Sequence, residues 1–336
     1  MMRLALTVVF GLIMTVSAAQ ARAQDDSNML DIKEWTVPYA KSRPRDPFAN
    51  SDESVWFVGQ RSGYLAHLDV ATGEIEKVDL KDGSGPHNLI VGRDGIVWYA
   101  GNRTTLIGRY DPQSGAIEEI PMPDARARDP HTLIFDADEQ HIWFTVQGGN
   151  FMGRLHIESR QIDLIESKTE RSRPYGIKLA PDGDIWVALF GTSKLAHIDA
   201  TTLVLTEYDL PRNESRPRRL EVLADGTVWY VDYVGGKLGR LTPDSGVIDE
   251  WQMPQGKNAR PYGMASDHLG RLWMVATGVQ PNEFVGFDPA GETFFAMTPV
   301  ASGGGTIRHM HYHQPTGSVW FGSDANTVGR AVVITD

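Results

Sequence analysis

Apolar residues recur along this chain in short blocks, each centred on a tryptophan and flanked by polar turns, as in Val97-Trp98-Tyr99. Seven such tryptophans are spaced 42 to 47 residues apart: Trp56, Trp98, Trp143, Trp186, Trp229, Trp273 and Trp320. Blocks rich in β-branched and aromatic residues are typical of strands. A period of this length is typical of the blades of a β-propeller. The pattern therefore predicts an all-β, seven-bladed propeller.

One repeat, residues 86–123, predicts the content of a blade. Strands are expected at 86–91, 96–100, 106–110 and 117–121. Asp94-Gly95 separates the first two strands, and a Pro/Ser/Gly cluster at 111–115 separates the last two. These residues favour the tight turns that join antiparallel strands. Each blade should therefore contain four antiparallel strands.

The two ends of the chain predict how the ring closes. Residues 32–38 resemble the fourth strands of other repeats, such as 205–211, while the last repeat has only three strands of its own. We expect the N-terminal segment to supply the outer strand of the last blade, to pair near 328–334 and to bury Trp35. This pairing would also cover an edge that is prone to aggregation. Residues 24–336 are thus predicted to form a single propeller domain.

Residues 1–23 have the pattern of a cleaved secretory signal peptide. Arg3 precedes an apolar stretch from Leu4 to Val16, and Ala21-Arg22-Ala23 offers small residues for cleavage. The apolar stretch is too short to cross a bilayer comfortably. We expect a periplasmic or secreted protein with no membrane span after cleavage, and a monomer.

Charge narrows the range of partners. The chain carries a formal charge of −11, and removing Arg3 and Arg22 with the signal peptide makes it −13. An acidic surface disfavours nucleic acid and anionic membranes as partners. The sequence also contains no cysteine, which rules out disulfides.

Polar side chains at the starts of the innermost strands predict a site on the axis. In most repeats a proline opens the first strand, and the residue after it (or after Ile307) is large and polar: Arg45, His87, His131, Tyr175, Arg218, Tyr262 and Arg308. The next positions add Asp46, Asn88, Thr132, Arg219 and His309. Seven blades would place the first set in a ring around one end of the channel. Histidine, tyrosine and arginine that converge on a concavity are typical of a binding or catalytic site.

Arginines should make this mouth basic on an otherwise acidic protein. Further arginines precede the blade prolines: Arg43, Arg173, Arg216 and Arg260. Guanidinium groups bind carboxylates and sulfates well. The expected partner is an anionic small molecule, glycan or peptide, with Arg45, Tyr175, Arg218, Tyr262, Arg308 and His309 as its binding residues. Pairing of these arginines with Asp46, Asp129 and Asp232 is the structural alternative.

The repeat Pro-x-x-Ile/Leu…Asp-Gly-x-Val-Trp-Phe/Tyr…Ile/Leu-Gly-Arg resembles that of the virginiamycin B (streptogramin) lyase family over nearly all of residues 30–336. The resemblance implies a seven-bladed propeller that opens a cyclic depsipeptide by elimination with the help of Mg²⁺. The family's Pro-His motif is matched by His87 and His131, and its preceding acid by Asp129. The family's glutamate after Trp-Phe-x is replaced by Val146, so the motif assigns no complete metal site.

Two functions follow from these observations. The first is an exported lyase-like enzyme that acts on an anionic or ester-containing ligand. In it His131 would be the general base or acid, His87 would assist, and Asp129 would orient His131 or hold a cation. The second is a non-catalytic binding propeller of the cell envelope, which the missing glutamate favours. A calcium-dependent lactonase propeller fits less well, because its axis would need carboxylates.

Overall fold

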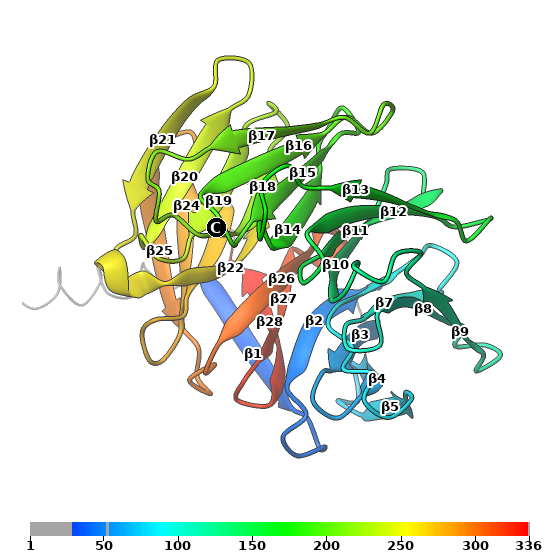
Figure 1. Ribbon diagram of the computed structural model, residues 1–336. Helices are drawn as coiled ribbons and strands as arrows, with labels where there is room; N and C mark the ends of the chain where they lie inside the picture. Colours follow the sequence, from blue (N-terminus) through cyan, green and yellow to red (C-terminus); the bar gives the residue numbers. More distant parts are fainter. Residues whose placement is uncertain (1–28, 52–53, 335–336) are drawn as a thin grey trace, which may run out of the picture.

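The computed structural model describes residues 29–51 and 54–334, which form seven four-stranded antiparallel sheets arranged around an axis (Figure 1). This confirms the predicted all-β propeller. The predicted signal peptide, residues 1–23, lies outside the described residues. Among those that are described, no helix has the length and apolar character needed to cross a membrane.

We number the blades in chain order. The first three blades contain β2 (Pro44–Ala49), β3 (Ser54–Gly59), β4 (Tyr64–Asp69) and β5 (Ile75–Asp79); β6 (Leu89–Val91), β7 (Val97–Gly101), β8 (Leu106–Tyr110) and β9 (Ile117–Pro121); and β10 (Pro130–Phe135), β11 (His141–Val146), β12 (Phe151–His156) and β13 (Ile162–Glu166). Blades 4 and 5 contain β14 (Pro174–Leu179), β15 (Ile185–Leu189), β16 (Lys194–Ile198) and β17 (Leu205–Asp209); and β18 (Pro217–Val222), β19 (Val228–Asp232), β20 (Lys237–Thr242) and β21 (Val247–Gln252).

Blade 6 contains β22 (Pro261–Ser266), β23 (Leu272–Ala276), β24 (Glu283–Asp288) and β25 (Thr293–Pro299), and blade 7 contains β26 (Ile307–His313), β27 (Ser318–Ser323), β28 (Thr327–Val333) and β1 (Leu30–Thr36). Two short 3-10 helices, η1 (Gly256–Ala259) and η2 (Gln314–Thr316), lie between strands. Within each sheet the strands follow one another in sequence order, except that β1 joins the outer edge of blade 7. The first strand of each blade faces the axis.

The N-terminal strand closes the ring as predicted. β1 runs antiparallel to β28, with Ile32 opposite Ala331 and Trp35 opposite Val328. The indole of Trp35 is buried and stacks on that of Trp320, with ring centroids 5.6 Å apart. Blade 7 is therefore built from both ends of the described chain.

The recurring Gly-Arg of the third strand has a packing cause. Gly153 lies opposite Phe144, and a Cβ on this glycine would overlap the aromatic ring. The next residue, Arg154, lies opposite Trp143, with its guanidinium carbon 5.5 Å from the indole centroid. The glycine thus makes room for one ring, and the arginine covers the other. The same aromatic–glycine pairing recurs in blades 2, 5 and 7.

The first strands depart from the predicted regularity, and this departure shapes the axis. The strand expected at 86–91 contains only Leu89–Val91, because the amide of His87 and the carbonyl of Asn88 both pair with Ala100. Two residues opposite one is the pairing of a β-bulge. The other six blades show a register shift at the equivalent place. A bulge therefore recurs at the start of every innermost strand.

Candidate functional site on the axis

The bulges let two successive side chains of one strand reach toward the axis. In blade 3 they are His131 and Thr132, which together oppose Thr145. Bulged residues of different blades then meet: Nδ2 of Asn88 donates to Asp46 over 3.0 Å, and Nη1 of Arg219 donates to Thr132 over 3.0 Å. Bulges commonly redirect side chains beside active sites. The predicted ring is thus assembled at one end of the axis.

Strained backbone accompanies the bulges. The residue before the opening proline has a positive φ in several blades, among them Arg43 (56°), Asp129 (68°) and Arg173 (50°). Asp46, within the bulge of blade 1, has φ 45° and is buried. Side chains other than glycine rarely adopt this conformation, and it concentrates at functional sites. The strain lies on the face where the ring was predicted.

Two histidines and a tyrosine lie ring against ring at the centre, in a buried group with tilted planes that we call the stack. The ring of His131 lies 3.6 Å from that of His87 and 4.1 Å from that of Tyr175, between centroids. Only 1% of His131 is exposed, and 4% of His87. Burial, together with Arg219 and Arg45, holds the pKa of both imidazoles well below the usual range. Both histidines are therefore neutral at pH 7.

Tyr175 and Tyr262 join through their hydroxyl groups across the axis, in a short hydrogen bond between blades 4 and 6. Both side chains are buried. The guanidinium carbon of Arg218 lies 4.2 Å from the ring centroid of Tyr262 and 5.7 Å from that of Tyr175. The tyrosine pair thus continues the histidine stack, with Arg218 against it.

The arginines of the mouth fall into two groups. Arg308 makes two 2.6 Å hydrogen bonds to the carboxylate of Asp324, which also accepts from Arg43. Arg218 instead lies 4.0 Å from the ring centroids of both Phe190 and Tyr233. Among the described residues no carboxylate pairs with Arg218. Of the three predicted anion-binding arginines, Arg308 is paired and Arg45 is buried beside Asp46, so Arg218 is the best placed.

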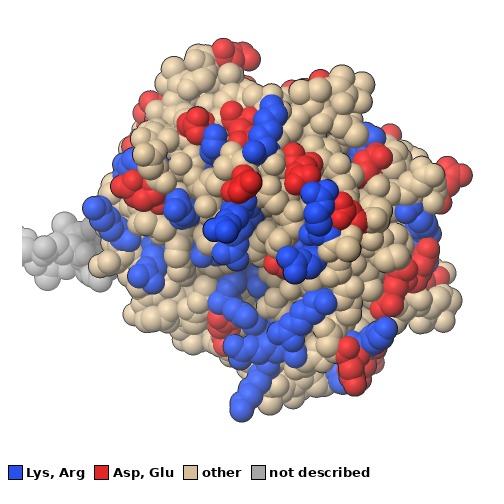
Figure 2. All heavy atoms as spheres, in the orientation of Figure 1, with Lys and Arg blue, Asp and Glu red and all other residues tan. Residues whose placement is uncertain are grey.

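Figure 2 shows that Lys and Arg gather around a hollow near the centre of the visible face, over the inner strands of Figure 1. Acidic residues are more frequent toward the rim in this view. The loops that follow second strands contribute Phe190 and Tyr233 to the surroundings of Arg218. Neither aromatic residue was predicted from the sequence. An aromatic residue directly after a second strand is the signal that could have identified them.

Asp129 lies beside the stack, with partners of its own. Its carboxylate accepts a short hydrogen bond from Asn102, and Gln147 can donate to the other oxygen over 3.2 Å. Nδ1 of His131 is bonded to the Thr132 hydroxyl over 2.8 Å instead. Burial raises the pKa of Asp129 to about 6 despite the hydrogen bond from Asn102. Asp129 and His131 are neighbours in sequence whose hydrogen bonds lead in different directions.

The described residues do not fit a magnesium site. Val146, where the family has glutamate, is fully buried in an apolar cluster with Ala127 and Phe151. Mg²⁺ requires a near-octahedral set of oxygen ligands. No group of three or more His, Asp or Glu residues suited to a metal occurs in the described part of the chain. We therefore derive no chemical step through magnesium.

A cavity of about 250 Å³ lies among the inner strands of blades 1 to 4 and 7. It is lined mainly by apolar residues of first strands, together with Asn88, Lys178 and His309. His311 stacks on Phe48 there, with centroids 4.1 Å apart, and burial lowers the pKa of His311 to about 3. Lys178 is paired with Glu221 over 2.7 Å. His309, a predicted ligand-binding residue, therefore faces this cavity.

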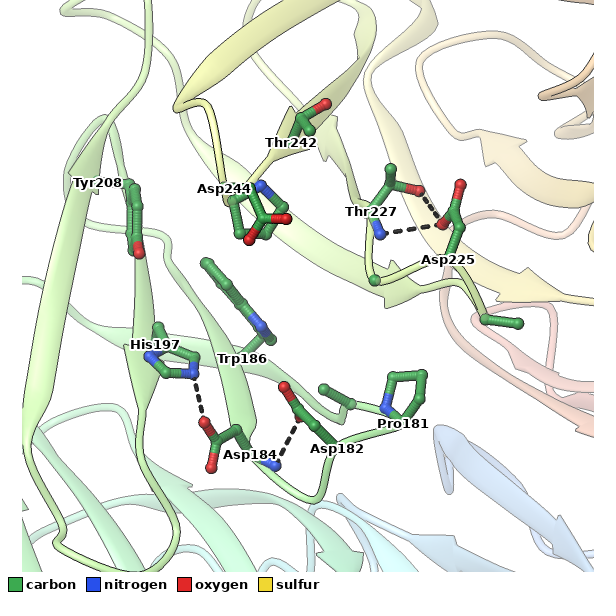
Figure 3. Close-up of a pocket in the computed structure, with 14 residues that line it drawn as sticks. Pro181, Asp182, Asp184, Trp186, His197, Tyr208, Asp225, Thr227, Thr242 and Asp244 are labelled. Atoms are coloured by element: carbon green, nitrogen blue, oxygen red, sulfur yellow. Dashed lines mark hydrogen bonds and ion pairs between the residues drawn. The ribbon is translucent and has the colours of Figure 1, made fainter.

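A larger cavity, of about 480 Å³, lies away from the axis between blades 4 and 5 (Figure 3). Its carboxylates belong to turns between strands. Asp225 accepts from both the amide and the hydroxyl of Thr227, and Asp184 accepts from His197 and from the amide of Ala200. These bonds hold the turns together, so the aspartates have a structural role and the axial ring is the better candidate site.

The fold and the ring together define a seven-bladed β-propeller with a polar, histidine- and arginine-containing site at one end of its axis. The chain belongs to the virginiamycin B lyase family, whose sequence model matches residues 21–198. No curated protein sequence matches the chain.

Solved structures with the same fold include a streptogramin B lyase, with a TM-score of 0.81 and 24% identity over 92% of this chain and 99% of that one. A catalytically inactive virginiamycin B lyase from Staphylococcus aureus with quinupristin has a TM-score of 0.81 and 23% identity over 91% and 100%. YCF48 bound to D1 peptide has a TM-score of 0.72 and 13% identity over 93% and 96%. At these identities the similarity establishes the fold.

Proposed function

We propose that this protein is a lyase-like enzyme that cleaves an anionic or ester-containing ligand by elimination at the axial mouth. The observation that carries the proposal is the stack of His87, His131 and Tyr175 beside Arg218. Neutral imidazoles and phenols can transfer protons, and a guanidinium can stabilise the enolate that forms when a proton is lost beside a carbonyl. Family membership supports the same class of reaction.

Elimination needs a group that takes a proton from carbon and a charge that stabilises the product anion. The proton leaves the carbon beside the carbonyl, the electron pair of that C–H bond forms a double bond, and the C–O bond of the ester breaks. The carboxylate leaves with the electron pair of the C–O bond. Arg218 is suited to hold the carbonyl or an acidic group of the ligand, because no carboxylate pairs with it within the described residues.

The test is a screen of streptogramin B, other cyclic depsipeptides and acidic glycans for an unsaturated product that absorbs in the ultraviolet. His131→Ala should lower turnover by about 10²- to 10⁴-fold, because it removes the central imidazole that is proposed to take part in proton transfer. His67→Ala is the matched control, since His67 lies in the third strand β4 and bonds to Ser54. Products that carry oxygen from labelled water would show hydrolysis and contradict the proposal.

A non-catalytic binding propeller is the second candidate. Val146 in place of a carboxylate and the deep burial of the ring favour it, since His131 and Tyr175 are only 1% and 3% exposed. In that case an anionic small molecule, glycan or peptide would bind the mouth without turnover. Part of the proposal, in either form, is that the protein acts as a monomer in the periplasm or outside the cell.

A further inference from the structure

The buried charges on the axis do not balance within the described residues. Arg45 and Arg219 are both about 95% buried, and Asp46 is the buried carboxylate next to them. Its oxygens lie 3.5 Å from Nε of Arg45 and 3.8 Å from Nη2 of Arg219. Glu221, another buried acid near the axis, pairs with Lys178 over 2.7 Å. Two guanidinium groups therefore share a single carboxylate.

Hydrogen bonding at these guanidinium groups is also incomplete. Nε and Nη2 of Arg45 and Nη2 of Arg219 have no hydrogen-bond partner among the described residues. A buried cation without a counter-charge is costly, so a further negative charge is expected close to this pair. The neighbouring imidazoles of His87, His131 and His309 cannot supply it, because a neutral imidazole carries no negative charge in this pH range.

The tyrosine pair is the remaining source of a negative charge in this cluster. Tyr175 lies with its ring centroid 5.1 Å from the guanidinium carbon of Arg219 and 5.7 Å from that of Arg218. Its hydroxyl shares a hydrogen bond with that of Tyr262. When one of two hydrogen-bonded phenols is ionised, the other stabilises it by donating its proton to the bond.

We propose that the Tyr175–Tyr262 pair holds a phenolate in the pH range in which free tyrosine is neutral, and that this phenolate accepts the proton in the elimination. The phenolate would supply the second counter-charge of Arg45 and Arg219. In the reaction it would take the proton from the carbon beside the carbonyl and become a neutral phenol. His131, packed against Tyr175, would then be a positioning residue. The first half of this inference, that the pair holds a phenolate, does not depend on the proposed function. The second half, that the phenolate accepts the proton, rests on the proposed function.

Charged and titratable groups on several inner strands surround the tyrosine pair and support this assignment. The charged and titratable groups there are Arg45 and Asp46 of β2, His87 before β6, His131 of β10, Arg218 and Arg219 of β18, Tyr233 after β19, and Arg308 and His309 of β26. Burial alone would raise the pKa of Tyr175, but Arg45, Arg219 and Arg218 bring it below the ordinary value of 10.0. Burial and Tyr175 raise the pKa of Tyr262. The two hydroxyls titrate as one pair, and the first proton leaves at the lower pH.

The position of Arg218 links the pair to the ligand. The guanidinium carbon of Arg218 lies 4.2 Å from the ring centroid of Tyr262, and the residue is partly exposed. An anion that binds Arg218 would therefore lie beside the tyrosine pair. A proton acceptor and an anion-binding group then act on the same ligand.

The first half can be tested on the whole protein without a substrate, by following phenolate absorbance as the pH is raised. We expect one step, of about one tenth of the total because the chain has ten tyrosines, below the pH at which the others ionise. Tyr175→Phe should remove this step. Tyr208→Phe, which removes a phenol on the outer strand β17, should leave it in place. If native protein and Tyr175→Phe titrate alike at low pH, the inference is overturned.

Tyr175→Phe could unfold the protein, so a second variant is needed. Arg45→Met removes one of the two guanidinium groups that need the phenolate, and should move the early step toward higher pH while Tyr175 remains. An unmoved step would contradict the charge-balance argument. A native protein whose early step is absent, but whose melting temperature rises with added chloride or phosphate, would show that an exchangeable anion balances the arginines instead.

The second half is tested on the pH dependence of kcat/KM for whichever substrate the screen identifies. Tyr262→Phe removes the hydroxyl that stabilises the phenolate, so the early titration step and the acidic limb of the rate profile, where the proton acceptor becomes protonated, should move to higher pH together. A limb that stays in place while the titration step moves would exclude the pair as proton acceptor. If a variant loses the early phenolate titration step but still catalyses the elimination, this inference is overturned and the proposed function stands.

Discussion

The turns between strands and the bulges at the axis belong to the same sevenfold repeat, yet their polar residues are used differently. Turn aspartates such as Asp182 and Asp225 accept hydrogen bonds from backbone amides two residues further on. The same bond recurs in other blades, for example from Ile96 to Asp94. At the axis the equivalent positions hold different residues in different blades, and several of their polar atoms lack partners.

This difference separates scaffold from site. A residue that every blade needs is kept in the repeat because each blade must make the same turn. A residue that varies around a symmetric ring is not needed for the blade itself. The axial bulges hold such residues, although the bulge itself has the same place in every blade. Variants in the repeat should therefore affect stability, whereas variants in the ring should affect binding and turnover.

Removal of the closing strand should have the largest effect on the scaffold. Deleting residues 24–38 removes β1, exposes the edge of β28 and uncovers Trp320, against which Trp35 stacks. The melting temperature should fall sharply and aggregation should increase. Trp35→Ala alone should cost about 3–5 kcal/mol of unfolding free energy. Thermal unfolding and light scattering measure both effects, and an unchanged melting temperature would refute closure by β1.

Anion binding should depend more on Arg218 than on Arg308. Arg218→Ala should weaken binding of a sulfated or uronate oligosaccharide about 10- to 100-fold, because a charged hydrogen bond contributes about 1.5–3 kcal/mol. Arg308→Ala should weaken it less, because Asp324 already pairs with Arg308. Titration calorimetry at two salt concentrations measures both, and binding should weaken with salt. Equal effects of the two variants, or binding that is insensitive to salt, would contradict the assignment of Arg218.

A turn aspartate provides the matching test on the scaffold. Asp184→Ala removes the acceptor of the Ala200 amide and of His197, and should cost about 1–2 kcal/mol of stability. Turnover and ligand binding should stay unchanged, since Asp184 lies in the cavity between blades 4 and 5. Urea unfolding and an activity assay measure the two effects. A loss of activity without a loss of stability would mean that this cavity, and not only the axis, has a functional role.

The sequence predicted the fold more completely than the site. The tryptophan period and the turn residues depend on local chemistry, so blade number, strand content and the pairing of β1 could be inferred and are confirmed. The ring positions could also be inferred, because they occupy equivalent places in each repeat. The partner of each ring side chain could not be inferred from the sequence. Asp324 pairs with Arg308 across a loop, and Tyr175 reaches Tyr262 two blades away, and neither contact has a local signal.

The smallest expected effect concerns Asp129, which lies next to the axial ring and changes stability with pH. Its pKa is raised by burial from 3.8 to about 6, so the folded state binds a proton more tightly than the unfolded state and loses stability as the pH rises from 4 through 6. Asp129→Asn should therefore stabilise the protein above pH 6, by about 1 kcal/mol after solvent screening, and have little effect below pH 4. Asparagine also tolerates the positive φ of this residue.

Asp124→Asn is the control, because hydrogen bonds from Arg126 lower the pKa of Asp124, so that variant should show no gain at high pH. If Asp129→Asn gains stability but loses turnover, the carboxylate is kept at a cost in stability because the site needs it. If Asp129→Asn changes the unfolding free energy by the same amount at pH 4 and pH 8, Asp129 does not titrate differently in the folded and unfolded states.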